Sequence, residues 1–156
     1  MTRQKNGDAA AGPMDIALAE ARAAAARQEV PVGAAVVRDG KVIAAAGNRT
    51  RELNDATAHA EMLAIRAAAN SLDRERLDDC DLYVTLEPCT MCVAAISFAR
   101  IRRLYFGALD PKGGAVESGV RFFAQPTCHH APEVYGGMAE RESGELLRGF
   151  FSKRRN

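Results

Sequence analysis

The chain has 156 residues, of which 47% are hydrophobic and 26% charged, and its formal net charge is +1. This length suits one domain with a full core, and the composition excludes extensive disorder, while the net charge favours neither nucleic-acid binding nor its absence. Because no apolar run approaches the length of a membrane span and the start lacks the apolar core of a secretory signal, we expect a cytoplasmic protein.

The predicted elements follow from apolar periodicity and from the residues that break it. Residues 1–12 are small and polar and predict a disordered tail, so we expect a single domain at 13–156. Helices are indicated by helix-forming apolar patterns, and strands by short apolar runs bounded by glycine, proline or polar residues. In chain order these patterns predict a helix at 14–28, strands at 34–37 and 42–46, a helix at 58–70, a strand at 81–86, a helix at 89–98, strands at 101–106 and 134–135, and a helix at 139–153.

Local signals mark the ends of several elements. Asp39-Gly40, between the first two strands, is a strong hairpin signal. Thr57 is expected to cap the second helix, and Pro88 ends the third strand and can occupy the first turn of the next helix. Residues 107–119 predict a long loop, which in compact domains is often functional. The alternation of helices and strands predicts a three-layer α/β/α fold with a central mixed sheet covered on both faces.

A cluster of metal-ligand residues lies in the middle of the chain. Cys89 and Cys92 are one helical turn apart, so both sulfur atoms face the same side, and a helix N-terminus favours their thiolate forms. His59 supplies a nitrogen ligand from the start of another helix. Three protein ligands leave one tetrahedral position for water, as in catalytic zinc sites. We therefore expect one zinc ion per chain, able to lower the pKa of a water molecule towards neutrality.

Glu61 is the candidate general acid and base. It lies two residues from His59 and is not needed as a ligand, so it can take a proton from water and deliver protons to a substrate. The spacing His-x-Glu followed by Pro-Cys-x-x-Cys is the signature of zinc-dependent nucleobase deaminases. The sequence therefore predicts hydrolytic deamination.

Simpler interpretations exist for each of these residues. A Cys-x-x-Cys pair also suits dithiol exchange, although that chemistry requires neither His59 nor Glu61. Glu61 alone could be a solvated helix glutamate. A closed, structural zinc site could recruit a fourth ligand from Cys128, His129 and His130. Otherwise Cys80 and Cys128 are expected to be unliganded and partly buried.

The chain resembles the bacterial tRNA adenosine deaminases, which convert the wobble adenosine of an anticodon loop to inosine. The resemblance spans residues 14–155, nearly the whole chain. It is carried by Glu29-Val30-Pro31-Val32-Gly33, Gly47-Asn48-Arg49, Thr57-Ala58-His59-Ala60-Glu61, Leu82-Tyr83-Val84-Thr85-Leu86-Glu87-Pro88-Cys89, Phe106-Gly107-Ala108 and Gly149-Phe150-Phe151.

The resemblance implies a fold, an assembly and a set of site residues. The fold would be the cytidine-deaminase-like one, with five strands in the mixed sheet, and the assembly a homodimer that binds a tRNA anticodon stem-loop. It implies that zinc is bound by His59, Cys89 and Cys92 and that Glu61 shuttles protons. It also implies that Asn48 hydrogen-bonds the flipped base, that Val30 and Leu86 line its pocket, and that Asp110 contacts the RNA backbone beside the target.

One segment departs from the family pattern. Where relatives commonly carry Asn-His-Arg, this chain has Cys-His-His-Ala-Pro at 128–132, so an arginine is missing. The last predicted helix keeps basic residues, namely Arg148, Lys153, Arg154 and Arg155. Together with the loop at 107–119 they favour RNA over a free nucleoside. Two alternatives stay open: a deaminase of free cytosine, cytidine, deoxycytidylate or guanine, and a non-catalytic, zinc-stabilised RNA-binding module.

Overall fold

The computed structural model describes residues 12–155, so the tail expected at 1–12 lies outside the described residues except for Gly12, the N-cap of the first helix. The elements in chain order are α1 (Pro13–Ala26), β1 (Gly33–Arg38), β2 (Lys41–Gly47), α2 (Ala60–Leu72), β3 (Cys80–Leu86), α3 (Thr90–Ala99), β4 (Arg103–Ala108), the short 3₁₀ helix η2 (Phe122–Ala124), β5 (Glu133–Tyr135) and α4 (Glu140–Arg155).

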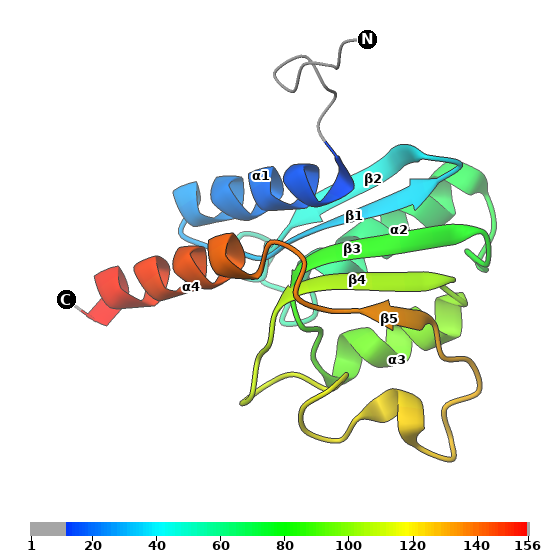
Figure 1. Ribbon diagram of the computed structural model, residues 1–156. Coiled ribbons are helices and arrows are strands. Elements are labelled where there is room, and N and C mark those ends of the chain that lie inside the picture. The colour runs from blue at the N-terminus through cyan, green and yellow to red at the C-terminus, as the bar shows by residue number, and fades with distance from the viewer. Residues whose placement is uncertain (1–11, 156) are drawn as a thin grey trace, which may run out of the picture.

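The described residues form three layers around one mixed sheet of five strands, as predicted. The strand order is β2-β1-β3-β4-β5, in which β1 is antiparallel to both neighbours and β3, β4 and β5 are parallel. Helices α1 and α4 lie on one face of the sheet, and α2 and α3 lie on the other (Figure 1).

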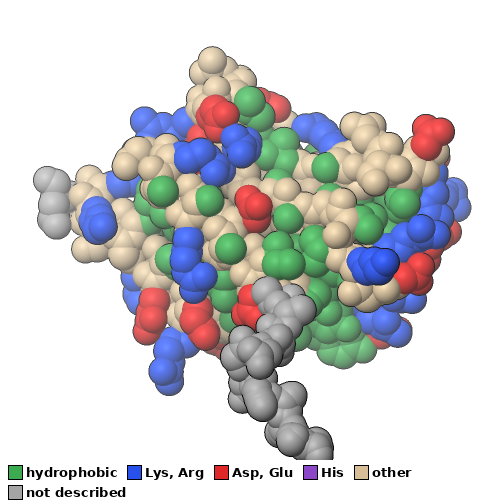
Figure 2. All heavy atoms as spheres, turned by 90° about the horizontal axis from the view of Figure 1, so that it is seen from above, with side chains coloured by type: hydrophobic (Ala, Val, Ile, Leu, Met, Phe, Trp, Pro, Cys, Tyr) green, Lys and Arg blue, Asp and Glu red, His purple; other side chains and the backbone are tan. Residues whose placement is uncertain are grey.

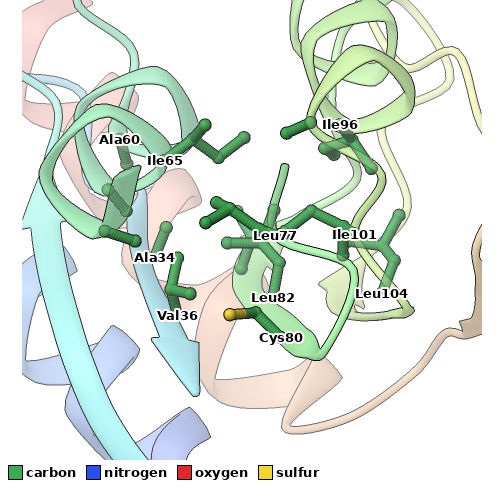
Figure 3. Packing of buried hydrophobic residues seen from close by; sticks show 14 of the residues in the cluster. Ala34, Val36, Ala60, Ile65, Leu77, Cys80, Leu82, Ile96, Ile101 and Leu104 are labelled. Atoms are coloured by element: carbon green, nitrogen blue, oxygen red, sulfur yellow. The ribbon is translucent and has the colours of Figure 1, made fainter. Parts of the chain in front are cut away.

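The main core lies between the sheet and the α2–α3 layer. Because side chains alternate between the faces of a strand, Leu82 of β3 points to this layer and packs near Ile65 of α2 and Ile96 of α3 (Figure 3). Tyr83, the next residue along β3, points to the opposite face and packs against the apolar residues of α1, including Leu18. Both faces of the sheet are therefore buried here, as alternating helices and strands require.

Glycine allows α1 to lie directly on the sheet. A Cβ atom at Gly33, the first residue of β1, would lie only 1.9 Å from the carbonyl oxygen of Ala17 in α1. At Gly47, the last residue of β2, a Cβ would lie 2.6 Å from the carbonyl oxygen of Glu20. The helix backbone thus occupies the space that any side chain at these two positions would need.

The predicted hairpin is confirmed, whereas the predicted helix cap is wrong. Asp39 and Gly40 both have positive φ angles, +52° and +76°, and link the paired residues Arg38 and Lys41, as the primed two-residue turns require. Thr57 does not cap α2, because the N-cap is His59, two residues later; the Thr57 hydroxyl instead donates a hydrogen bond to Asp55 at 2.7 Å.

Several predicted boundaries also move. The N-cap of α2 is His59 and that of α3 is Cys89, so Pro88 precedes the cap of α3 rather than starting the helix. Strand β4 continues to Ala108, so the loop expected from residue 107 begins two residues later, and η2 interrupts the segment that follows it.

One edge of the sheet gathers the segments that the sequence marked as functional. The antiparallel pairing places the start of β1 and the end of β2 at the same edge as the carboxyl ends of β3 and β4. The residues just outside these strands therefore converge, as is usual for binding sites of open α/β sheets.

The face of the molecule at the top of Figure 1 carries charges of both signs. Figure 2 shows basic and acidic side chains lying beside one another on this face, with hydrophobic side chains exposed between them. This mixture agrees with the net charge of +1. Among the described residues, no helix is both long and apolar enough to span a membrane.

Candidate active site

The three predicted zinc ligands converge at the N-termini of α2 and α3. The Nδ1 atom of His59 lies 3.6 Å from the sulfur of Cys89 and 3.6 Å from the sulfur of Cys92. Tetrahedral zinc with Zn–N of about 2.0 Å and Zn–S of about 2.3 Å separates its nitrogen and sulfur ligands by about 3.5 Å. The three side chains therefore fit one zinc ion in both donor chemistry and spacing, and they form the only such cluster found among the described residues.

The helix ends explain why these side chains are aligned. His59 and Cys89 are the N-caps of α2 and α3, and neither side chain caps its own helix. The unpaired backbone N–H groups in the first turn of each helix therefore direct partial positive charge at the site. Interaction with the Cys92 thiol lowers the pKa of Cys89 to about 4, and the hydrogen bond with Cys89 raises the pKa of His59. Cys89 is thus the readier thiolate of the pair.

Glu61 lies on the first turn of α2 beside the three ligands. Its side chain is only 4% exposed, and burial raises its pKa to about 7. A carboxyl group with a pKa near neutrality can both accept and donate a proton at physiological pH, which general acid–base catalysis requires. The geometry excludes the interpretation of Glu61 as a solvated helix glutamate.

Asn48 supplies the cap that His59 does not. Its Oδ1 accepts a hydrogen bond of 2.9 Å from the backbone N–H of Ala60, the first residue of α2. Its own backbone is held as well, because its N–H donates to Val32 and its carbonyl accepts from Arg27. With Oδ1 engaged, the Nδ2 group is the part of the amide left to donate to a ligand.

A pocket of about 210 Å³ connects these groups. It combines a metal site, a buried carboxyl group, an amide donor and apolar walls. It brings together Glu61 with the four predicted substrate residues, and its lining consists of Val30, Val32, Asn48, His59, Glu61, Leu86, Glu87, Cys89 and Asp110. All of them come from the sheet edge described above or from the start of α2 or α3.

A wider groove of about 770 Å³ opens from this pocket towards α4. It shares Val30, Leu86 and Asp110 with the inner pocket. Its outer part joins the two regions that the sequence singled out for RNA, since it includes Lys112 from the loop after β4 and Arg148 from α4. The remaining lining residues are Leu109, Leu147, Phe151 and Ser152.

The segment at 128–132 lies outside both cavities. His130 Nε2 donates a hydrogen bond of 2.7 Å to the backbone carbonyl of Ile101, and the sulfur of Cys128 lies 3.7 Å from Ser97 Oγ. Neither residue joins the metal cluster found in the described chain, which argues against a closed four-ligand site. Cys80 is fully buried rather than partly buried, because Leu82 and its neighbours enclose it (Figure 3).

Sequence reasoning assigned no role to three residues at this edge. Val32 and Glu87 line the inner pocket, and Glu29 is a buried carboxylate beside Val30. All three lie inside segments that carry the family resemblance. A signal was therefore present, but a buried glutamate cannot be told from an exposed one until its partners are known.

Comparisons with known proteins agree with this geometry. The family model for the cytidine and deoxycytidylate deaminase zinc-binding region matches residues 10–108. The tRNA-specific adenosine deaminase of Agrobacterium fabrum is 71% identical over 142 residues, which cover 91% of this chain and 93% of that protein.

Two solved structures are similar to this chain. One from a study of A-to-I editing by tRNA:A34 deaminases at the wobble position of transfer RNA is 72% identical, with a TM-score of 0.86, and covers 86% of this chain and 98% of its own. A guanine deaminase from Nitrosomonas europaea is 26% identical, with a TM-score of 0.74, and covers 90% of this chain and 83% of its own. The chain therefore belongs to the zinc-dependent cytidine and deoxycytidylate deaminase family and, within it, to the tRNA-specific adenosine deaminases.

Proposed function

We propose that this chain hydrolyses adenosine to inosine at the wobble position of a tRNA anticodon loop. The observation that carries the proposal is the groove of about 770 Å³ that continues from the small pocket to Lys112 and Arg148. A free base needs only the small pocket, whereas a splayed RNA strand needs a path for its neighbouring nucleotides. The identity to tRNA-specific adenosine deaminases supports the same substrate.

We assign the zinc ion to His59, Cys89 and Cys92, one ion per chain. When bound there, zinc would act as a Lewis acid that makes a water molecule more acidic. The two thiols and the Nδ1 atom already converge at 3.6 Å, so the protein needs little rearrangement to hold the ion.

Glu61 moves the protons. Its carboxylate accepts one proton from the attacking water and donates it to N1 of adenine as the C6 centre becomes tetrahedral. Glu61 then takes the second proton from the new C6 hydroxyl group and donates it to the exocyclic amine, which leaves as ammonia as the C–N bond breaks and the C6 carbonyl of inosine forms. Burial keeps the pKa of Glu61 near 7, so the same group serves as base and as acid.

The pocket orients the base. Asn48 Nδ2 donates a hydrogen bond to a ring nitrogen of the flipped adenine, because Oδ1 is held by Ala60. Val30 and Leu86 pack against the faces of the base. Since an anticodon-loop base is already unpaired, its extrusion into this pocket costs little.

The groove binds the flanking nucleotides. Asp110, shared by pocket and groove, contacts the backbone of the RNA beside the target, and a carboxylate at this point can accept a hydrogen bond from a ribose 2′-hydroxyl. Arg148 and Lys112 meet phosphate groups. We also propose a cytoplasmic location, which a tRNA substrate supports.

The assembly we propose is a homodimer. The family resemblance supports it, and so does Phe98 on α3, which is 77% exposed and is the most exposed large hydrophobic side chain among the described residues. We assign the surface around Phe98 to the partner chain, because aromatic side chains are enriched in protein interfaces.

The test compares a wobble-adenosine anticodon stem-loop with adenosine, cytidine and guanine. We expect good turnover of the stem-loop and almost none of the small substrates, because binding energy from flanking nucleotides positions the reactive base. Activity should fall as salt rises, since phosphate contacts contribute to affinity. Faster turnover of guanine or cytidine than of the stem-loop would overturn the substrate while leaving the zinc chemistry in place.

A further inference from the structure

Glu87 is a buried carboxylate that is surrounded by the backbone of one loop. It lies between the pocket residue Leu86 and the segment Pro88-Cys89, and it is only 2% exposed. Its Oε1 accepts hydrogen bonds of 2.9 Å from Asp110 N and Ser118 Oγ, and its Oε2 accepts from the backbone amides of Val116, Glu117 and Ser118 at 3.0, 2.9 and 2.9 Å.

Backbone amides replace a counter-ion at this position. Among the ion pairs formed by the described residues, none includes Glu87. A buried carboxylate without compensation is strongly unfavourable, so the loop must keep all its donors in place for the charge to stay buried. The carboxylate and the loop conformation therefore depend on each other.

The same loop is tied to the zinc-ligand segment. Ala115 N donates to the carbonyl of Pro88 at 2.9 Å, and Gly114 forms a β-bridge with Cys89. A Cβ atom at Gly114 would lie 2.4 Å from Glu87 Cδ, so the loop backbone lies directly against the carboxylate. These contacts fix the loop relative to Cys89.

Asp110 connects the hydrogen bonds of Glu87 to the substrate pocket, which it lines. Its N–H donates to Glu87 Oε1, and its own Oδ1 accepts a hydrogen bond of 3.0 Å from Gly113 N, which sets the direction of its carboxylate. We infer that Glu87 is a positioning residue that holds the Asp110 carboxylate at the junction of pocket and groove and thereby contributes to RNA binding. This inference rests on the proposed function, which gives Asp110 its contact with RNA.

The isosteric variant Glu87→Gln separates positioning from simple packing. Its amide nitrogen must replace one carboxylate oxygen, and on the Oε2 side it would face three N–H donors. On the Oε1 side it meets Asp110 N–H and the Ser118 hydroxyl, which can turn to accept instead. The variant should therefore keep the bonds to residues 116–118 and lose the bond to Asp110.

The experiment measures stem-loop kinetics on zinc-loaded wild type, Glu87→Gln, Asp110→Asn and the double variant. We expect Glu87→Gln to raise KM about tenfold, to leave kcat within about twofold and to keep its zinc. Adding Asp110→Asn should raise KM no further, because the first change has already displaced that carboxylate. The matched control is Glu29→Gln. Glu29 is also a buried glutamate, and it accepts hydrogen bonds from the backbone amides of Arg51 and Glu52. Its effect on KM should be independent of Asp110→Asn, so their double variant should show the product of the two single effects.

A proportional loss of zinc and kcat in Glu87→Gln, with an independent effect of Asp110→Asn, would show a merely structural role and overturn the inference. Should Glu87→Gln fail to fold, Ser118→Ala removes one donor, and we expect about a threefold rise in KM with the same lack of additivity. Independent effects of Ser118→Ala and Asp110→Asn would again overturn it.

Amide hydrogen exchange keeps this test separate from the proposed function. In Glu87→Gln without RNA, the Asp110 amide should exchange faster than in wild type, while the amides of residues 116–118 stay protected. If wild type does not deaminate the stem-loop, the proposed function fails, yet faster exchange at Asp110 still supports the anchoring. An Asp110 amide that stays equally protected refutes the anchoring whatever the substrate proves to be.

Discussion

Glu61 carries the proton transfers at the scale of single residues, and an isosteric change tests it. Glu61→Gln keeps the size of the side chain and one acceptor oxygen but cannot exchange protons, so turnover of the stem-loop should fall by about 10²–10⁴-fold. Single-turnover kinetics would measure the fall, and elemental analysis should find the zinc retained. The exposed Glu75 offers a control, because Glu75→Gln should leave turnover unchanged. Comparable rates for Glu61→Gln and wild type would refute the mechanism.

The metal ligands make a second prediction at this scale. Purified protein should contain about one zinc per chain, and Cys89→Ala or Cys92→Ala should remove it. His59 and Cys89 are also the N-caps of two helices, so the loss of zinc should lower Tm as well as abolish activity. Cys128→Ser should keep its zinc, because that sulfur lies near Ser97. Zinc loss from this last variant would favour a four-ligand structural site.

The sequence predicted the metal ligands and Glu61 better than it predicted the buried carboxylates Glu29 and Glu87. The metal ligands and Glu61 follow a short spacing pattern, so their convergence was predictable. The roles of Glu29 and Glu87 were not, because both accept hydrogen bonds from backbone more than twenty residues away. Such partners depend on how a loop returns to the sheet, which no local pattern encodes.

At the scale of elements, the contact between α1 and β1 is the most restrictive. Gly33→Ala places a methyl group 1.9 Å from a helix carbonyl oxygen, so the helix must move away. We expect the free energy of unfolding to fall by about 1–3 kcal/mol, measured by denaturant titration.

The control for this prediction is a glycine in open space. A Cβ at Gly149 of α4 would have no neighbour within 4 Å, so Gly149→Ala should raise the free energy of unfolding by about 0.5–1 kcal/mol. If both variants lose stability equally, the close approach of α1 is not the cause.

The existence and order of the elements were predictable, while their ends were less so. Alternating apolar residues identified β3, and Asp39-Gly40 identified the first hairpin. The start of α2 was misplaced because Asn48, from a different loop, caps that helix. Thr57 is the better local cap by type, but its hydroxyl is engaged by Asp55. Tertiary contacts thus overrode local preference.

At the scale of the whole molecule, the exposed Phe98 makes a prediction about assembly. Phe98→Glu places a charge on the surface that we assign to the partner chain, and burying it there would be unfavourable. Wild type should sediment as a dimer at micromolar concentration and the variant as a monomer with unchanged circular dichroism. A wild-type monomer, or a variant that dimerises equally well, would contradict the proposal.

Pocket and groove explain how a common fold can serve different substrates. The zinc ligands, Glu61 and Asn48 come from the sheet edge and the helix starts, whereas Lys112 and Arg148 come from the later loop and the last helix. The family model matches only residues 10–108, so Lys112 and Arg148 lie beyond the matched region. In this chain, the chemistry and the proposed RNA contacts therefore occupy successive parts of the sequence.

The two roles of the Asn48 amide, as a helix cap and as a proposed base contact, have an evolutionary consequence. The same amide supports the first turn of the helix that presents His59 and Glu61, and in our proposal it also reads the base. A substitution that altered base preference here would simultaneously disturb the presentation of the metal ligand and the proton carrier. One substitution at this position would therefore affect both proposed roles of the amide. New substrate preferences are more accessible through Val30, Leu86 and the residues of the groove, which support no helix end.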